Sequence, residues 1–336
     1  MRLRKRGLLV AGAMAVLLLV AAACSDVSSS SSSASGSGSF PDNSGTTLNL
    51  SVSPWQGSAA NIAVAQKLLE DKLGYPVKTT DIDEYAQFPA LANGDLDATL
   101  EVWPSGHAKD YKKYIEAGNG VVDGGLLGVT GQIGWWIPTY LLTDNPELAT
   151  WEGIQGNESM FQTSESGSAG QLLDGDPSYV TFDQNIADNL GLNLKVVYAG
   201  SEAAELTELK TAYNAQNPIL MYFWTPHWAQ EKYDLTMVQL PEVTPDCEQA
   251  AADGTDAYAC AYPQDDLYKA FNQDLQTKAP AAFALLSAMS WTNDDQNVVA
   301  LGINEGDDPA VAAQKWIDEN PDVWQPWVDA GLAAQS

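Results

Sequence analysis

Hydrophobic and polar residues follow strand and helix periods along much of the chain. Apolar residues alternate with polar ones over 47–53, which predicts a strand. They then recur every three or four residues in a segment that predicts a helix, capped by Ser58 and ended by Gly74. The pattern continues with a strand, a short helix and a strand, over 76–80, 88–93 and 98–102. This β-α-β-α-β order predicts a parallel sheet covered by helices.

The same alternation returns later in the chain. It predicts two helices and two strands, over 183–190, 194–198, 202–214 and 219–223. After a polar segment between two cysteines, the end of the chain is predicted to be mostly helical and is rich in tryptophan. The chain beyond residue 45 is longer than one hydrophobic core usually covers. We therefore expect an α/β protein of two lobes.

The first residues are typical of an export signal. MRLRKR is a basic start, followed by an uncharged apolar run that ends in small residues, so 1–23 is predicted to be a signal peptide. Ala21-Ala22-Ala23 before Cys24 resembles the lipobox of bacterial lipoproteins, in which the cysteine is acylated. The Ser-rich stretch over 24–45 is predicted to be a flexible tether. We expect an extracytoplasmic protein anchored to the cell membrane by a lipid on Cys24, the alternative being an uncleaved membrane anchor.

The remaining two cysteines are consistent with export. With Cys24 assigned to the lipid, Cys247 and Cys260 are an even pair in an oxidising compartment, and we expect them to form a disulfide. A metal site is the weaker interpretation because neither histidine lies near the pair in the sequence. We predict no metal and no cofactor.

The charge excludes several functions. The chain has 16 Lys and Arg against 44 Asp and Glu, and after Cys24 it contains lysine but no arginine. A nucleic-acid partner needs clustered basic residues, so that role is excluded. Any bound anion must be held by backbone, histidine, lysine or hydroxyl donors rather than by a guanidinium group. Because the chain also lacks a GxSxG elbow and a phosphate loop placed after a strand, we predict no catalytic residues.

Three of the 11 tryptophans follow predicted strands. Trp103 and Trp224 come directly after one, and Trp55 follows the strand that ends near Ser53. In open α/β sheets ligands bind beyond the carboxyl ends of the strands, so the three indoles are expected to face one crevice. A single tryptophan in such a position more often packs in the core, but three together favour a site. Aromatic faces attract quaternary ammonium groups, which suits an acidic protein without arginine.

The ordered motifs resemble one known family, the glycine betaine/proline-type substrate-binding proteins of ABC importers. The segments that carry the resemblance are VSPWQGSAANIAVAQKLLEDKLGYPV, LANGDLDATLEVW, GQIGWWIPTY, DPSYVTFDQNIADNLGLN, AGSEAAELTELKTAY and MYFWTPHW. The resemblance implies a two-lobed periplasmic-binding-protein fold of type II with two hinge crossings, near 140–144 and 239–243. Lobe I would then comprise 46–142 and 242–336, and lobe II 143–241.

The resemblance also implies the ligand site. Trp103, Tyr179 and Trp224 match the aromatic cage around the trimethylammonium group, although Tyr179 stands where some members carry tryptophan. Trp55 and Tyr140 match aromatic residues of choline-binding relatives.

A second group of residues would bind the carboxylate of the ligand. His107 keeps the Trp-x-x-x-His spacing of a carboxylate-binding histidine, and the backbone amides of Val180 and Thr181 match the other donors. A helix start can bind an anion in this way without arginine.

The function implied by the resemblance is solute binding without a chemical step. The ligand would be glycine betaine or a related quaternary amine, namely proline betaine, carnitine or choline, and the partner a membrane permease of an ABC importer. We expect a monomer. The alternatives are a secreted carbohydrate-binding or glycoside-hydrolysing lipoprotein, since tryptophan also stacks on sugars, and a purely structural surface lipoprotein.

Overall fold

The structure is a computed structural model that describes residues 42–335. The predicted signal peptide over 1–23, the lipid on Cys24 and most of the predicted tether lie outside the described residues. Over 42–335, no helix combines the length and the apolar character needed to cross a membrane.

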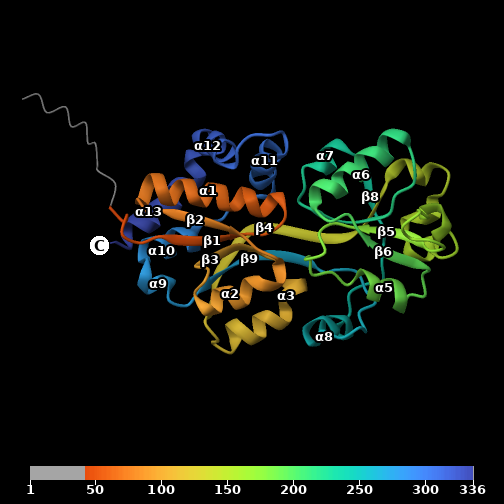
Figure 1. Cartoon of the computed structure of the whole chain (residues 1–336), viewed down its shortest axis with the longest axis horizontal. Helices are drawn as coiled ribbons and strands as arrows, with labels where there is room; N and C mark the ends of the chain where they lie inside the picture. The colour runs from red at the N-terminus through yellow and green to blue at the C-terminus, as the bar shows by residue number, and fades with distance from the viewer. Residues whose placement is uncertain (1–41, 336) are drawn as a thin grey trace, which may run out of the picture. The chain divides into compact units, whose positions relative to one another are not determined.

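The first parallel set of strands follows the predicted order. β1 (Leu48–Val52) lies between β2 (Val77–Asp81) and β3 (Ala98–Val102), and pairs with both in parallel. Helices α1 (Gln56–Leu73) and α2 (Gln87–Asn93) connect these strands (Figure 1). The alternation that predicted β1 has its physical basis in Leu48 and Leu50, which are both fully buried.

The second parallel set lies further along the chain. β5 (Gly170–Asp174) pairs in parallel with β6 (Leu194–Tyr198) and with β7 (Met221–Thr225). Helices α5 (Asp183–Asn189) and α6 (Glu202–Ala215) accompany them, as the sequence predicts. β5 was not predicted. β7 begins later than predicted and contains Trp224 rather than ending before it.

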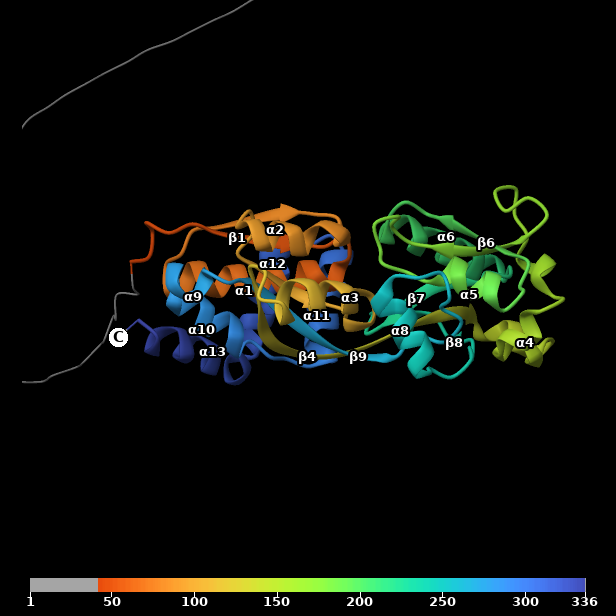
Figure 2. The ribbon, with the colours of Figure 1, turned by 90° about the horizontal axis from the view of Figure 1, so that it is seen from below.

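Two long strands connect these sets into one mixed sheet. The strand order is β2-β1-β3-β9-β4-β7-β5-β6, and the short strand β8 (Leu235–Met237) pairs with β4. β4 (Val121–Pro138) is antiparallel to both β7 and β9 (Gln264–Asn272). Both views show β4 and β9 running from the first parallel set toward the second (Figures 1 and 2). The sheet is therefore mixed, whereas the sequence predicted only its parallel parts.

β4 changes its partners along its length. Its first part pairs with β9, its last part with β7 and β8, and Gln132 pairs with both β7 and β9. The chain thus passes from one set of strands to the other inside β4, before the predicted crossing near 140–144. The lobe boundaries at 142 and 242 stay predictions.

Helices from the end of the chain pack around α1. α10 and α13 pack against each other, and both contact α1, as do α11 and α12. Trp316 and Trp327 stack at 6.1 Å in this layer and are both buried, so they belong to the core. The four helices around α1 are α10 (Pro280–Ala288), α11 (Asn293–Asn304), α12 (Pro309–Glu319) and α13 (Pro321–Ala333), and the short helix α9 (Leu275–Lys278) packs against α10.

Short helical turns make up the other connections. The α-helical ones are α3 (Pro104–Asp110), α4 (Trp151–Ile154), α7 (Ala229–Lys232) and α8 (Pro245–Asp253). The others are η1 (Glu84–Ala86), η2 (Tyr111–Glu116), η3 (Thr139–Thr143), η4 (Pro146–Ala149) and η5 (Glu158–Phe161).

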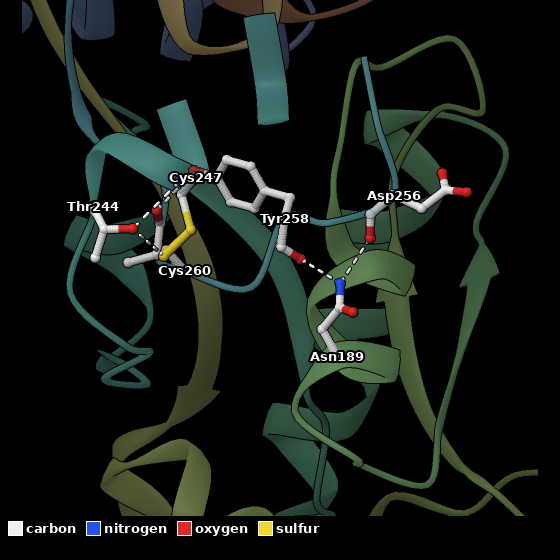
Figure 3. The surroundings of a disulfide bond; sticks show 7 residues. Asn189, Thr244, Cys247, Asp256, Tyr258 and Cys260 are labelled. Atoms are coloured by element: carbon white, nitrogen blue, oxygen red, sulfur yellow. Dashed lines mark hydrogen bonds between the residues drawn. A yellow bond between two sulfur atoms is a disulfide. The ribbon is translucent and has the colours of Figure 1, made fainter. Parts of the chain in front are cut away.

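A disulfide joins Cys247 and Cys260, which confirms the predicted pair. Cys247 lies in α8, whose first turn is capped by the hydroxyl of Thr244 (Figure 3). The side chain of Asn189 donates to two backbone carbonyls of the closed loop, one of them that of Tyr258 at 3.0 Å (Figure 3). The disulfide therefore closes this polar loop, and the hydrogen bonds of Asn189 hold the loop against α5.

Reducing this disulfide is expected to lower the free energy of unfolding by about 3 kcal/mol. The two cysteines are 13 residues apart, and opening the loop gives the unfolded chain more conformations. Urea unfolding with and without a thiol reductant measures the difference. A protein with Cys247→Ser and Cys260→Ser together is the control and should not respond to reductant; equal stability of the oxidised and reduced wild type would contradict the prediction.

Candidate functional site

Aromatic side chains from both parallel sets surround one narrow cavity. The space that admits the centre of a water molecule is about 20 Å³, which suits a small compact group. Four aromatic residues that the sequence predicted for the site line this cavity, and all four are buried. The residues that line the cavity are Trp55, Glu84, Trp103, Gly106, Ile133, Tyr179, Val180, Tyr222 and Trp224.

Trp55 and Trp103 occupy equivalent places after two neighbouring strands. Trp55 follows β1 at the start of α1, and Trp103 follows β3 at the start of α3. Because β1 and β3 are parallel, their carboxyl ends share one edge of the sheet, which brings the two indoles together. The predicted cap of α1 was wrong: the helix begins after Trp55, and the hydroxyl of Ser58 accepts from the Ser53 amide instead.

A buried carboxylate holds both indoles. Trp55 Nε1 and Trp103 Nε1 donate to Glu101 Oε1 at 2.7 and 3.1 Å. Glu101 Oε2 accepts from Asn61 at 2.6 Å and from Gln296 at 3.0 Å. Burial raises the pKa of Glu101 to about 7, and the hydrogen bonds from the two indoles lower it less than burial raises it. Glu101 therefore fixes the orientation of two walls of the cavity.

Tyr179 and Trp224 form the wall contributed by the second parallel set. The Tyr179 ring lies edge-on to Trp55 and to Trp224, with 5.8 Å between ring centroids in each case. Its hydroxyl donates to the Pro54 carbonyl oxygen at 3.0 Å, so it joins the two sets of strands. Tyr222 also lies beside Tyr179, at 6.0 Å, and completes this wall.

The strand β4 closes the floor of the cavity. Ile133 lines it directly. Two residues earlier, and hence on the same face of the strand, a Cβ at Gly131 would lie 2.2 Å from the ring of Trp103. Glycine is required here because the indole packs directly on the backbone of β4.

The predicted carboxylate-binding residues meet a carboxylate of the protein itself. Glu84, in η1, lines the cavity and is buried. Its Oε1 is 2.9 Å from His107 Nε2, and its Oε2 accepts from the Val180 amide at 2.8 Å. His107 Nδ1 is 3.0 Å from Asp110. Burial lowers the pKa of His107, but hydrogen bonds and charges of Asp110 and Glu84 outweigh it and raise the pKa to about 9, so His107 is protonated at neutral pH.

Two predicted site residues lie elsewhere. Tyr140 does not line the cavity: it lies in η3, where its hydroxyl donates to the Asn217 carbonyl oxygen at 2.7 Å. The side chain of Thr181 donates to Asp174 at 3.2 Å, and Thr181 does not line the cavity either. Sequence spacing cannot decide such cases, because it does not fix on which side of a turn a side chain lies.

Further hydrogen bonds join the two parallel sets around the cavity. Tyr85 donates from its hydroxyl to the Tyr179 carbonyl oxygen at 2.8 Å. The Gln56 amide donates to Glu202 at 2.9 Å, and Trp228 Nε1 donates to the Gln56 side chain at 2.7 Å. The structure is thus a closed arrangement in which the walls of the cavity are held together.

Sequence reasoning missed Glu84, Glu101 and Tyr222. Tyr222 had a usable signal, because it precedes Trp224 by two residues in β7 and therefore shares its face of the strand. Glu101 had a weaker one, because it lies near the end of β3, two residues before Trp103, which follows that strand. Glu84 had none, since the acidic loop that contains it is typical of a solvated surface.

Comparison with known proteins agrees with the fold. The trimethylamine N-oxide-binding protein of Pelagibacter ubique is 28% identical over 269 residues, covering 76% of this chain and 83% of that protein. The crystal structure of lactococcal OpuAC complexed with glycine betaine has a TM-score of 0.65 at 22% identity, covering 84% of this chain and 99% of that one.

An ABC-transporter choline-binding protein in complex with choline is similarly close in structure. Its TM-score is 0.67 at 20% identity, covering 86% of this chain and 96% of that one. The fold is therefore the two-lobed type II fold of periplasmic binding proteins, as predicted. The chain belongs to the family described as the substrate binding domain of ABC-type glycine betaine transport systems, whose profile matches residues 46–319.

Proposed function

We propose that this protein is the extracytoplasmic solute-binding component of an ABC importer and binds glycine betaine or a related quaternary amine. The observation that carries the proposal is the cavity walled by Trp55, Trp103, Tyr179 and Trp224 together. Methyl groups on nitrogen donate no hydrogen bonds of ordinary strength, so aromatic faces are their natural partners, each worth about 0.5 to 2 kcal/mol.

The charges around the cavity support a cationic guest. Glu84 is the charged residue among those that line it, and Glu101 lies behind two of the indoles. Lysine and arginine are absent from the lining residues. Negative charge in a buried site attracts a cation strongly, because little water screens it.

Binding without a chemical step fits this arrangement. The first parallel set contributes Trp55 and Trp103, and the second contributes Tyr179 and Trp224, so the ligand completes contacts only when both sets approach. Ligand binding would therefore favour the closed lobes over the open ones. The closed protein would then deliver its ligand to the permease.

The proposal also covers the N-terminal segment and the division into lobes. A signal peptide over 1–23, a lipid on Cys24 and a tether over 24–45 would hold the binding domain at the outer side of the cell membrane. Lobes of 46–142 with 242–336 and of 143–241 remain our proposed division. Family membership and the relatives do not support the carbohydrate alternative.

The test is a titration with a panel of quaternary amines. Calorimetry and intrinsic tryptophan fluorescence with glycine betaine, proline betaine, carnitine and choline are expected to show saturable binding of at least one. No binding of any of the four would overturn the proposal. Saturation by maltose without a response to the amines would favour the carbohydrate alternative instead.

A further inference from the structure

Glu84 occupies the position that the resemblance assigns to the carboxylate of the ligand. The two donors that reach it are His107 and the Val180 amide, both of which were predicted to bind a ligand carboxylate. Each oxygen of Glu84 takes one of them, at 2.9 and 2.8 Å. The geometry is that of a bound carboxylate, but the carboxylate belongs to the protein.

The donors have no remaining capacity for a second carboxylate. The other ring nitrogen of His107 is bound to Asp110 at 3.0 Å. The second histidine, His227, is also committed: its Nε2 is 2.8 Å from Glu202, and its Nδ1 accepts from the Ala229 amide. A ligand carboxylate entering the cavity would therefore meet the like charge of Glu84 in a buried site, which is costly.

Glu84 also connects the two sets of strands, as a bound ligand carboxylate would do. It comes from the turn after β2, whereas Val180 precedes α5, so its hydrogen bond joins the two parallel sets across the cavity. A ligand carboxylate bound by the same donors would make this connection in its absence. With Glu84 present, the ligand has to supply only two groups. One is a cation that contacts the aromatic rings, and the other is a hydrogen-bond donor to the carboxylate of Glu84.

We propose that this site selects a quaternary ammonium ligand that carries a hydroxyl group and no carboxylate, choline being the representative. The trimethylammonium group contacts the aromatic walls, and the hydroxyl donates to Glu84. Trimethylamine N-oxide fits less well because its oxygen has no hydrogen to donate to an ionised carboxylate. This inference rests on the proposed function and narrows its ligand.

The experiment compares choline with glycine betaine and with trimethylamine N-oxide by calorimetry at pH 7, using the wild type and Glu84→Ala. The wild type is expected to bind choline at least ~10-fold more tightly than glycine betaine. Glu84→Ala frees His107 and the Val180 amide, so it should weaken choline binding, strengthen glycine betaine binding, and shift the ratio of the two affinities at least ~10-fold toward betaine.

Glu202→Ala is the matched control. Glu202 likewise accepts a hydrogen bond from a histidine of its own set of strands, His227, and one from a backbone amide of the other set, that of Gln56. Unlike Glu84, it does not line the cavity. Its removal should change both affinities by a similar factor and leave their ratio intact. A ratio that shifts equally in both variants would contradict a specific role of Glu84.

The outcomes separate the inference from the proposed function. If the wild type binds glycine betaine or trimethylamine N-oxide as tightly as choline, the inference is overturned while amine binding stands. If it binds none of the amines, the proposed function itself fails. The wild-type comparison alone decides these points even if Glu84→Ala does not fold, which thermal unfolding of the variant would reveal.

Discussion

Replacing Trp224 by alanine is expected to weaken binding of the preferred quaternary amine at least ~100-fold. The change removes one aromatic wall of the cavity, with its cation–π attraction of up to ~2 kcal/mol and the apolar surface that shields the cation from water. It also removes the ring against which Tyr179 packs at 5.8 Å, so a second wall loses its support. Calorimetry with choline measures the loss.

Two variants make this result specific. Trp224→Phe keeps an aromatic face of smaller size and should lose less affinity than Trp224→Ala. Trp151→Ala removes a partly buried tryptophan in α4 that does not line the cavity, so it should bind choline as the wild type does. Unchanged binding by Trp224→Ala, in a protein that folds as the wild type does, would rule out the aromatic cage.

The protein is expected to be more stable at pH 5.5 than at pH 8, with a melting temperature that falls by about 5 °C or more between them. Burial raises the pKa of Glu101 and of Asp174 to about 7 and that of Asp265 to about 6. The folded state therefore holds protons that the unfolded state has released. Raising the pH through this window removes them, and the free energy of unfolding decreases.

His107 acts in the same direction at higher pH. Its pKa of about 9 lies above the ordinary value of 6.5, so its contribution is present below pH 6.5 and is lost as the pH rises through 9. Lys269 acts in the opposite sense, because burial lowers its pKa to about 8, but its effect begins only near that pH. The excess of 44 acidic over 16 basic residues adds repulsion as the pH rises.

Thermal unfolding followed by circular dichroism at the two pH values measures this dependence. Glu101→Gln removes one of the buried acids and should reduce the difference in melting temperature. Glu116→Gln, at an exposed position of η2, should leave the difference as it is in the wild type. A wild type that melts at a higher temperature at pH 8 would show that the buried acids do not control its stability.

Much of the fold could be predicted because it depends on local periodicity. The first parallel set, α5, α6 and the disulfide were predicted from alternation, helical spacing and cysteine pairing. β4 and β9 could not be, because both are antiparallel partners of strands far away in the chain, and β4 changes partners along its length. The predicted parallel sheet was thus correct only in its two local parts.

Some residues of the aromatic site could likewise be predicted from the sequence, and others could not. Trp55 and Trp103 were predictable because each follows a strand of one parallel pair, and parallel strands end at the same edge. Tyr140, which was predicted to be a site residue, lies in a short turn and does not line the cavity, and in such a turn the spacing of residues does not fix the direction of a side chain. Tyr222 was predictable from the period of two that strands impose, because it lies two residues before Trp224 in the same strand.

The sequence by itself determined that this protein has an acidic, arginine-free body after Cys24, in which tryptophans follow strands that end at a common edge. Only the tertiary structure decided that Glu84 meets both His107 and the Val180 amide. Glu84 and Val180 are 96 residues apart, on turns without periodicity, and they meet because the two parallel sets of strands close over the cavity. Long-range contacts between irregular segments leave no local pattern, so the feature that we propose selects the ligand is the one the sequence could not show.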